Sequence, residues 1–403
     1  FITPDQYERF ANRSIGADRH SFLVGGTREG VADYFAWRNQ QSDAQPTWRI
    51  GESDPCNIIY SSGTTGQPKG IKHLYRRRVQ SMYELSLAHR YHFESISICP
   101  IGLYSNIAWA SLFCALIVGG TCVIQSKFET EAWMKAVEDS AVTHTFMVPI
   151  QFQRVLDDPG FAPSRVASLE AVISGGAPLF SELKQRIGRE FGCALIELYG
   201  LTEGFMTTLQ PGEAVGRVAS VGKPVRGNDL ILVDDDDRVL AWGATGEICV
   251  RSVHWMSEYH NRPEATEEIK FVDPDGTLWL RTGDIGRTDS EGYLYITDRK
   301  KDMIVSGGQN IYPVDIEAIM IEHPAVSQIA VIGLPHEKWG ETPVACVVLS
   351  PGFASDVSDE IREWTNERVG KRQRISRVLL SDDLPRNPNG KVLKRLLRDE
   401  LKA

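Results

Sequence analysis

The stretch YSSGTTGQPKG, residues 60–70, decides how this chain is interpreted. Hydroxyl side chains, and backbone N–H groups freed by Gly63 and Gly66, can surround a polyphosphate, and Lys69 adds a mobile cation. The Walker pattern GxxxxGK[ST] does not fit, because Pro68 stands where its second glycine is required. The stretch therefore predicts a phosphate-binding loop of another type. Its candidate phosphate contacts are Ser61, Ser62, Gly63, Thr64, Thr65, Gly66 and Lys69.

Composition limits the function classes that need to be considered. With 403 residues the chain is too long for one core, so we expect two or three domains. A formal charge of −9 gives no overall attraction to nucleic acid or anionic lipid, so any phosphate site must be local. Seven scattered cysteines without CxxC pairs predict reduced thiols in a cytoplasmic protein, and no apolar run is long enough to span a bilayer. We expect neither a nucleic-acid partner nor integral membrane association.

Hydrophobic patterning predicts an α/β protein of several parts. Apolar runs bounded by glycine alternate with helical segments in the first half, which favours layered α/β structure with partly parallel sheets. Short strands and turns then predict a β-rich subdomain, and a small α+β domain follows the charged sequence DRKK. The predicted parts are 1–53, a remnant of an N-terminal lobe; 54–215, an α/β nucleotide- and acid-binding subdomain; 216–298, the β-rich subdomain; and 299–403, a mobile C-terminal domain.

Six further motifs follow the opening stretch in order along the chain. They are SGGAPL (174–179), YGLTE (199–203), GEICVR (246–251), RTGD (281–284), DRKKDMIVSGGQNIYP (298–313) and NPNGK (387–391). Together with residues 60–70 they resemble the signatures of the adenylate-forming superfamily, which includes acyl-CoA synthetases, luciferases and adenylation domains. One such motif would be weak evidence, but seven in order are specific. In character the chain is most similar to AMP-forming acyl- or aryl-CoA ligases.

The resemblance implies an ATP site with Mg²⁺. Besides the loop, its implied ATP and AMP contacts are Gly176, Ala177, Tyr199, Gly200, Asp284 and Arg299. Tyr199 can stack on a purine, and Asp284 offers two acceptors to the ribose hydroxyls, with Arg299 as the second ribose contact. Thr202 can donate to the α-phosphate, and Glu203 can hold Mg²⁺ through a hard oxygen ligand. Each residue alone also fits an ordinary turn or strand end.

Lys391 resembles the lysine that activates the acid. Attack of a carboxylate on the α-phosphate brings two anions together, and a cation that touches both offsets their repulsion. A solvated lysine in a basic segment is the plain alternative. We therefore assign the catalytic roles to Lys391, Thr202 and Glu203.

The resemblance also implies a second half-reaction, in which coenzyme A is the co-substrate. Lys301 stands at the position of the family's hinge, about which the small domain rotates. After rotation Gly307 and Gly308 line the pantetheine tunnel. Trp339 is a candidate tunnel wall, and Arg374 can meet CoA phosphates, although an interface tryptophan and a solvated charge are the alternatives.

Side chains expected around the acid are mainly apolar, aromatic or small. They are Tyr104, Ser105, Asn106, Trp109, Gly175, Gly204, Phe205 and Met206. No acid is present to pair with a substrate ammonium, which favours an apolar acyl or aryl carboxylate over an amino acid. The sequence LYSN lacks the histidine that the family often carries there. Arg76 to Arg78, on an expected helix after the loop, are expected to be solvent-exposed.

Several readings remain open. The resemblance begins at about Asp54, so we expect a truncated N-terminal lobe and an exposed apolar face. The predicted function is an AMP-forming acid–CoA ligase, with a homodimer as the expected assembly. A stand-alone enzyme that loads a carrier protein is one alternative. A non-catalytic nucleotide-binding fragment is another, whereas a luciferase-like oxidation has no support in the residues.

Overall fold

The computed structural model describes residues 3–4, 22–26, 31–61, 68–387 and 390–402, which divide into two compact units, 1–51 and 52–403. In the first unit, strand β1 (Phe22–Leu23) pairs in parallel with β2 (Ala32–Asp33). Helix α2 (Tyr34–Arg38) follows, and the Asp33 carboxylate caps it by accepting the N–H of Ala36 at 2.6 Å.

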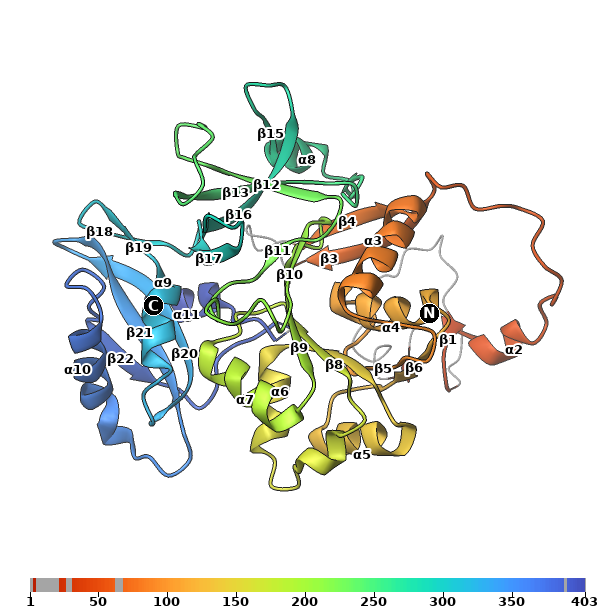
Figure 1. Ribbon diagram of the computed structural model, residues 1–403, viewed down its shortest axis with the longest axis horizontal. Helices are drawn as coiled ribbons and strands as arrows, with labels where there is room; N and C mark the ends of the chain where they lie inside the picture. The colour runs from red at the N-terminus through yellow and green to blue at the C-terminus, as the bar shows by residue number, and fades with distance from the viewer. Residues whose placement is uncertain (1–2, 5–21, 27–30, 62–67, 388–389, 403) are drawn as a thin grey trace. The chain divides into compact units, whose positions relative to one another are not determined.

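A seven-stranded sheet in the order β11-β10-β9-β8-β7-β5-β6 forms the centre of the second unit (Figure 1). Its strands are β5 (Ile96–Cys99), β6 (Thr121–Ile124), β7 (His144–Met147), β8 (Ala171–Gly175), β9 (Ala194–Gly200), β10 (Met206–Leu209) and β11 (Lys223–Pro224). The pairs from β6 to β9 are parallel, and β10 and β11 are antiparallel additions. Parallel strands of this kind are buried on both faces, which explains their continuous apolar runs.

Helices cover both faces of this sheet. One face packs against α3 (Tyr75–Ala88) and α4 (Asn106–Ile117). The other packs against α5 (Thr130–Ser140), α6 (Pro149–Asp157) and α7 (Ser181–Phe191), with the 3₁₀ turn η1 (Pro163–Val166) between α6 and α7. The expected α/β layers are therefore confirmed.

The ends of the opening stretch lie on one hairpin. Strand β3 (Pro55–Ser61) pairs antiparallel with β4 (Lys69–Leu74), and β14 (Glu258–Tyr259) adds to the other edge of β4. Ser61 stands opposite Lys69, so the two ends of the predicted loop are neighbours. Residues 62–67, and with them five of the predicted phosphate contacts, lie outside the described residues.

A second, antiparallel sheet follows and carries the RTGD and DRKK motifs. Its strands are β12 (Asn228–Val233), β13 (Thr245–Ser252), β15 (Lys270–Val272), β16 (Leu278–Thr288) and β17 (Leu294–Arg299), with α8 (Pro263–Glu268) before β15. Leu230, Ile248 and Leu280 form part of the core on one face. The register pairs Asp284 on β16 with Arg299 on β17, which brings two predicted nucleotide contacts side by side.

The C-terminal region is a small α+β structure, as expected. Its sheet contains β18 (Ile304–Ser306), β19 (Gln309–Ile311), β20 (Val326–His336), β21 (Gly340–Leu349) and β22 (Arg377–Leu380). Its helices are α9 (Pro313–Met320), the short η2 (Ser355–Val357), α10 (Ser358–Arg368) and α11 (Lys394–Lys402). Helices α9 and α10 pack on one face of the sheet and α11 on the other, so the segment that carries Lys391 precedes a packed helix.

The surface of helix α3 carries an exposed apolar stripe. Val79, Tyr83 and Leu87 recur every four residues, so they share one face, and all three are exposed. Among the described residues, no helix combines the length and the apolar character that crossing a membrane requires.

Candidate functional site

Tyr199, Asp284 and Arg299 meet where the two large sheets adjoin. The Tyr199 hydroxyl donates to Asp284 Oδ2 at 2.7 Å, and Arg299 Nε lies 3.2 Å from Asp284 Oδ1. The Asp284 carboxylate is buried, and burial together with its charge raises the pKa of Tyr199 well above the usual value. Tyr199 is therefore a fixed hydroxyl donor, and each oxygen of Asp284 already has one partner.

Lys391 reaches this group from the far end of the chain. Lys391 is half-buried, and desolvation followed by the charge of Arg299 lowers its pKa to about 7. Asp284 and Asp302 act in the opposite direction, while Lys301 lowers the pKa further. The structure therefore brings the predicted catalytic lysine, the predicted ribose contacts and the predicted hinge residue into one electrostatic neighbourhood.

Asp298 connects the two sides of the predicted hinge. Its Oδ1 accepts the N–H of Arg299 at 2.6 Å, and its Oδ2 accepts the N–H of Val314 in the first turn of α9 at 3.2 Å. Burial raises the pKa of Asp298 to about 6, against the opposing charge of Lys394. Lys394 in turn forms a 2.7 Å ion pair with Glu317. Of these contacts, the Asp298 to Val314 hydrogen bond is the one that spans the predicted hinge.

The Thr202–Glu203 turn is held by residues from distant strands. His73 Nε2 donates to the carbonyl of Thr202 at 2.8 Å, and burial lowers the pKa of His73 to about 3, so its ring is neutral. The Tyr259 hydroxyl donates to Glu203 Oε1 at 2.7 Å. The Lys69 ammonium lies 4.8 Å from the centroid of the Tyr259 ring. The predicted metal residue and the lysine of the predicted phosphate loop therefore share one neighbour.

Glycines shape the predicted adenine edge. Gly176 has a φ of +83°, and a Cβ atom there would lie 2.7 Å from Ile107 Cδ1. A side chain at this position would be strained and crowded. At Gly200 a Cβ atom would lie 2.8 Å from the carbonyl oxygen of Phe205. Ala177, half-buried, directly follows Gly176.

The predicted acid contacts divide into two groups. Near the start of α4, Ser105 caps the helix by accepting the N–H of Ile107 at 3.3 Å, and Trp109 Nε1 donates to the carbonyl of Leu103 at 2.9 Å. Tyr104 is exposed. The other group is more buried, because Phe205 and Met206 pack into the cores of the second and first sheets, respectively.

Glycines accompany this second group. Gly175 is buried, and a Cβ atom there would lie 2.7 Å from the carbonyl oxygen of Leu198. A Cβ atom at Gly204 would collide with the carbonyl oxygen of His254. The contribution of these residues to an acid pocket stays a prediction.

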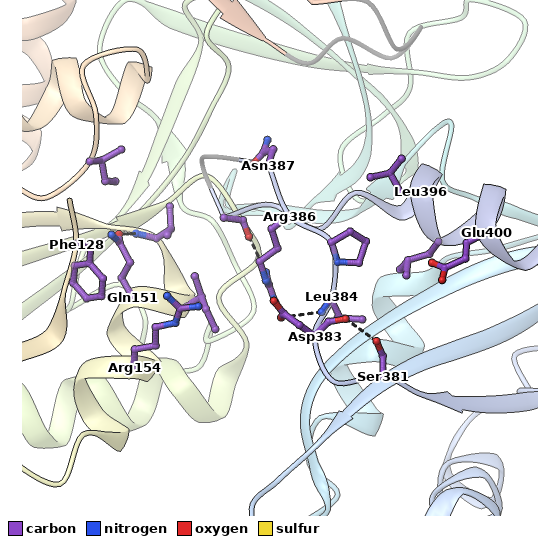
Figure 2. Close-up of a pocket in the computed structure, with 16 residues that line it drawn as sticks. Phe128, Gln151, Arg154, Ser381, Asp383, Leu384, Arg386, Asn387, Leu396 and Glu400 are labelled. Atoms are coloured by element: carbon purple, nitrogen blue, oxygen red, sulfur yellow. Dashed lines mark hydrogen bonds between the residues drawn. The ribbon is translucent and has the colours of Figure 1, made fainter. Parts of the chain in front are cut away.

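A cavity of about 770 Å³ separates α6 from the segment that carries Lys391 (Figure 2). Phe128, Gln151 and Arg154 line one side, and residues from 381–387 and 390–400 provide the other. Arg386 braces this second wall by donating to Gly390 O at 2.7 Å and to Gln328 Oε1 at 2.8 Å. Gly390, which directly precedes Lys391, is thus held from within the C-terminal region.

Three of the four predicted CoA contacts are neighbours. The N–H of Gly307 donates to the carbonyl of Trp339 at 2.8 Å, and a Cβ atom at Gly307 would lie 3.1 Å from Trp339 Cε3. Gly308 follows in the same turn, between β18 and β19. Arg374 is exposed, and no described contact links it to this turn.

Comparison with known proteins then identifies the family. The model of the AMP-binding enzyme matches residues 12–260, and that of the AMP-binding enzyme C-terminal domain matches residues 315–391. The chain belongs to the AMP-binding enzyme family. Membership of the adenylate-forming superfamily, expected from the motifs, is confirmed.

Named relatives of this AMP-binding enzyme are acid–CoA ligases. Long-chain-fatty-acid–CoA ligase FadD13 of Mycobacterium tuberculosis is 35% identical over 376 residues, covering 92% of this chain and 73% of the relative. Indoleacetate–CoA ligase of Aromatoleum aromaticum is 34% identical over 375 residues, covering 91% and 71%. Among solved structures, ATP-bound MatB from Rhodopseudomonas palustris superimposes with a TM-score of 0.84 at 29% identity, covering 91% and 72%.

Sequence reasoning missed three residues of the AMP-binding enzyme that support the site. His73 follows the opening stretch closely, whereas Tyr259 lies outside the quoted motifs, and their partners are 129 and 56 residues away. The expected exposure is wrong for Arg78, which is buried and donates to Asn57 Oδ1 at 3.2 Å and Asn106 Oδ1 at 2.8 Å. The reason is tertiary packing, because α4 and β3 cover the face of α3 from which Arg78 projects.

Proposed function

We propose that this AMP-binding enzyme is an AMP-forming ligase that joins an apolar acyl or aryl carboxylic acid to coenzyme A. The position of Lys391 carries the proposal. Lys391 lies 107 residues after Asp284 in the sequence. In the fold, the charges of Asp284 and Arg299 nevertheless act on its ammonium. A purely structural lysine would gain little from a position beside an arginine.

In the first half-reaction, an oxygen of the acid attacks the α-phosphorus of ATP, and the bond to the β-phosphate breaks to release pyrophosphate. Lys391 offsets the repulsion between the carboxylate and the α-phosphate, and the Thr202 side chain donates to the α-phosphate oxygen. Residues 61–66 and Lys69 hold the β- and γ-phosphates. Tyr199, Asp284 and Arg299 fix the nucleoside, so the α-phosphate meets the acid in one orientation.

The residues at Glu203 fit a Mg²⁺ ion. Within the described residues, no cluster of three His, Cys, Asp or Glu side chains exists that would form an all-protein metal site. Mg²⁺ at nucleotide sites typically takes one or two carboxylates together with phosphate oxygens and water, which matches the single carboxylate of Glu203. When bound, the ion would neutralise charge that develops on the leaving pyrophosphate.

In the second half-reaction, the CoA sulfur attacks the acyl carbonyl, and the bond to AMP breaks. We assign rotation of the C-terminal region to the hinge at Lys301, which withdraws Lys391 and presents Gly307, Gly308 and Trp339. This rotation requires loss of the Asp298 to Val314 hydrogen bond. We assign the exposed side chain of Arg374 to contacts with the phosphates of CoA.

Two assays test this function. Acid-dependent exchange of pyrophosphate into ATP, screened with aryl, cinnamyl and fatty acids of graded length, should identify the acid, and added CoA should then yield a thioester. Transfer to a carrier protein but not to CoA would favour the carrier-loading alternative. Absence of exchange with every acid would refute the ligase and favour the non-catalytic fragment. The homodimer and the cytoplasmic location stay predictions.

A further inference from the structure

Tyr259 is placed by backbone pairing at the described end of the phosphate loop. Strand β14 pairs antiparallel with β4, so that Tyr259 stands opposite Ile71, and the N–H of His260 donates to the carbonyl of Gly70 at 2.7 Å. The Tyr259 side chain is 5% exposed and packs against Ile71 and Met256. Its ring therefore has little freedom to leave this position.

The hydroxyl and the ring of Tyr259 interact with two residues of opposite charge. Its hydroxyl donates to Glu203 Oε1 at 2.7 Å, and its ring centroid lies 4.8 Å from the ammonium of Lys69. The face of an aromatic ring is negative and attracts a cation, while the phenol O–H attracts an anion. One rigid group thus fixes both the lysine of the phosphate loop and the carboxylate assigned to the metal.

The hydrogen bond also selects which oxygen of Glu203 remains available. The phenol O–H of Tyr259 acts as the donor in this contact, because a carboxylate oxygen can only accept. Within the described part of the chain no donor contacts Oε2. The N–H of Met256 fixes the Glu203 backbone by donating to its carbonyl at 2.7 Å. The orientation of the Glu203 carboxylate, and with it the direction of Oε2, is therefore defined.

We propose that Tyr259 is a positioning residue for the Mg²⁺–triphosphate group: its hydroxyl orients Glu203 toward the ion, and its ring holds Lys69 beside the phosphates. This inference rests on the proposed function, in which Glu203 holds the metal. It makes a separable prediction, because loss of the hydroxyl removes only the metal contribution, whereas loss of the ring removes the lysine contribution as well.

Calorimetric titration of the enzyme with ATP, in Mg²⁺ and separately in EDTA, tests the proposal without requiring turnover. Tyr259→Phe should reduce the Mg²⁺-dependent gain in ATP affinity by about tenfold, as expected for a hydrogen bond to a charged group, and leave affinity in EDTA unchanged. Tyr259→Leu should also weaken ATP binding in EDTA. In a Glu203→Gln background, Tyr259→Phe should cause no further loss of the Mg²⁺ effect.

Tyr293 provides a matched control. It is 6% exposed, its hydroxyl donates to Glu213 Oε1 at 3.3 Å, and Lys223 lies 4.3 Å from its ring centroid, but it stands at the turn end of the β16–β17 hairpin. Tyr293→Phe should leave the Mg²⁺ effect intact. An unchanged effect in Tyr259→Phe, or an equal loss in both variants that follows a drop in melting temperature, would overturn the assignment. Equal ATP binding with and without Mg²⁺ in the unmodified enzyme would overturn the metal role of Glu203 as well.

Discussion

The Tyr199 hydroxyl donates to Asp284 across the junction of two sheets, at 2.7 Å. Asp284 also forms an ion pair with Arg299. A bound ribose would therefore contact a carboxylate that Tyr199 and Arg299 already orient. Tyr199→Phe removes the donor and retains the ring. We expect the KM for ATP to rise about threefold to tenfold, with kcat changed by less than twofold, because the loss lies in nucleotide binding.

Tyr295 offers a control for this change, since its hydroxyl donates to Asp289 Oδ2 at 3.2 Å on the same hairpin. Tyr295→Phe should leave the KM for ATP unchanged. Steady-state kinetics at saturating acid and CoA measure both variants. A fall in kcat for Tyr199→Phe with an unchanged KM would contradict a role in nucleotide binding.

Removal of the Lys391 ammonium should separate the two half-reactions. Lys391→Ala loses the cation that offsets the repulsion between acid and α-phosphate, so pyrophosphate exchange should fall at least 100-fold. Thioester formation from supplied acyl-adenylate and CoA should remain within about threefold of the unmodified enzyme. Lys394→Ala is a useful comparison, because that ammonium pairs with Glu317 instead. Equal loss in both half-reactions of Lys391→Ala would refute the assignment.

The pH dependence of adenylation should report the charge on Lys391. Burial and Arg299 lower the pKa of Lys391 to about 7, so the cation is present below this pH and is lost above it. We expect kcat/KM for ATP to fall as pH rises through about 7, since this ratio reports the free enzyme. Lys391→Arg keeps a cation throughout, so its profile should lack that fall. An alkaline limb that persists in Lys391→Arg would assign the titration to another group.

Trp339 should affect only the CoA half-reaction. Its half-exposed ring borders Gly307, and Lys338 lies 4.8 Å from the ring centroid, so it offers an apolar wall beside a cation. Trp339→Ala should raise the KM for CoA about tenfold and leave pyrophosphate exchange unchanged. Trp242, exposed on the β-rich subdomain, is the control: Trp242→Ala should change neither. Slower exchange in Trp339→Ala would point to a folding defect.

The sequence predicted the parts of the fold where local pattern decides structure. Apolar runs such as that of β8 alternate with helical segments, as predicted. The nucleotide residues followed from ordered motifs. The sequence pattern does not show which side of a helix its neighbours cover. In the run Arg76 to Arg78, the packing of α4 against α3 decides which arginine is buried.

Side-chain contacts between segments far apart in the sequence could not be predicted from the sequence either. His73 and Tyr259 acquire their roles only when β4, β14 and the Thr202–Glu203 turn meet, and nothing near either residue in the sequence marks its partner. Asp284 was expected to offer two free acceptors to a ribose. The structure gives each oxygen a protein partner, because Tyr199 and Arg299 come from β9 and β17.

A buried ion pair should make a measurable contribution to stability. Lys184 on α7 and Glu197 on β9 are each 7% exposed and form an ion pair, and Lys184 also donates to the carbonyl of Ser220 at 3.4 Å. Burial raises the pKa of Glu197 to about 7 although Lys184 opposes the shift. Lys184→Met leaves a buried carboxylate without its cation and should lower the free energy of unfolding by about 3–5 kcal/mol at pH 8.

The pH dependence of this loss has a defined sign. Because the pKa of Glu197 is raised in the folded state, the proton-bound form favours folding, and stability decreases as pH rises from about 4.5 toward 7. Without Lys184 that pKa should rise further, so Lys184→Met should be less destabilising at pH 6 than at pH 8. Adding Glu197→Leu should recover part of the stability, since no unpaired charge remains. Urea unfolding at both pH values measures these differences, and a pH-independent loss would show that the deficit comes from packing around α7 and not from the buried carboxylate.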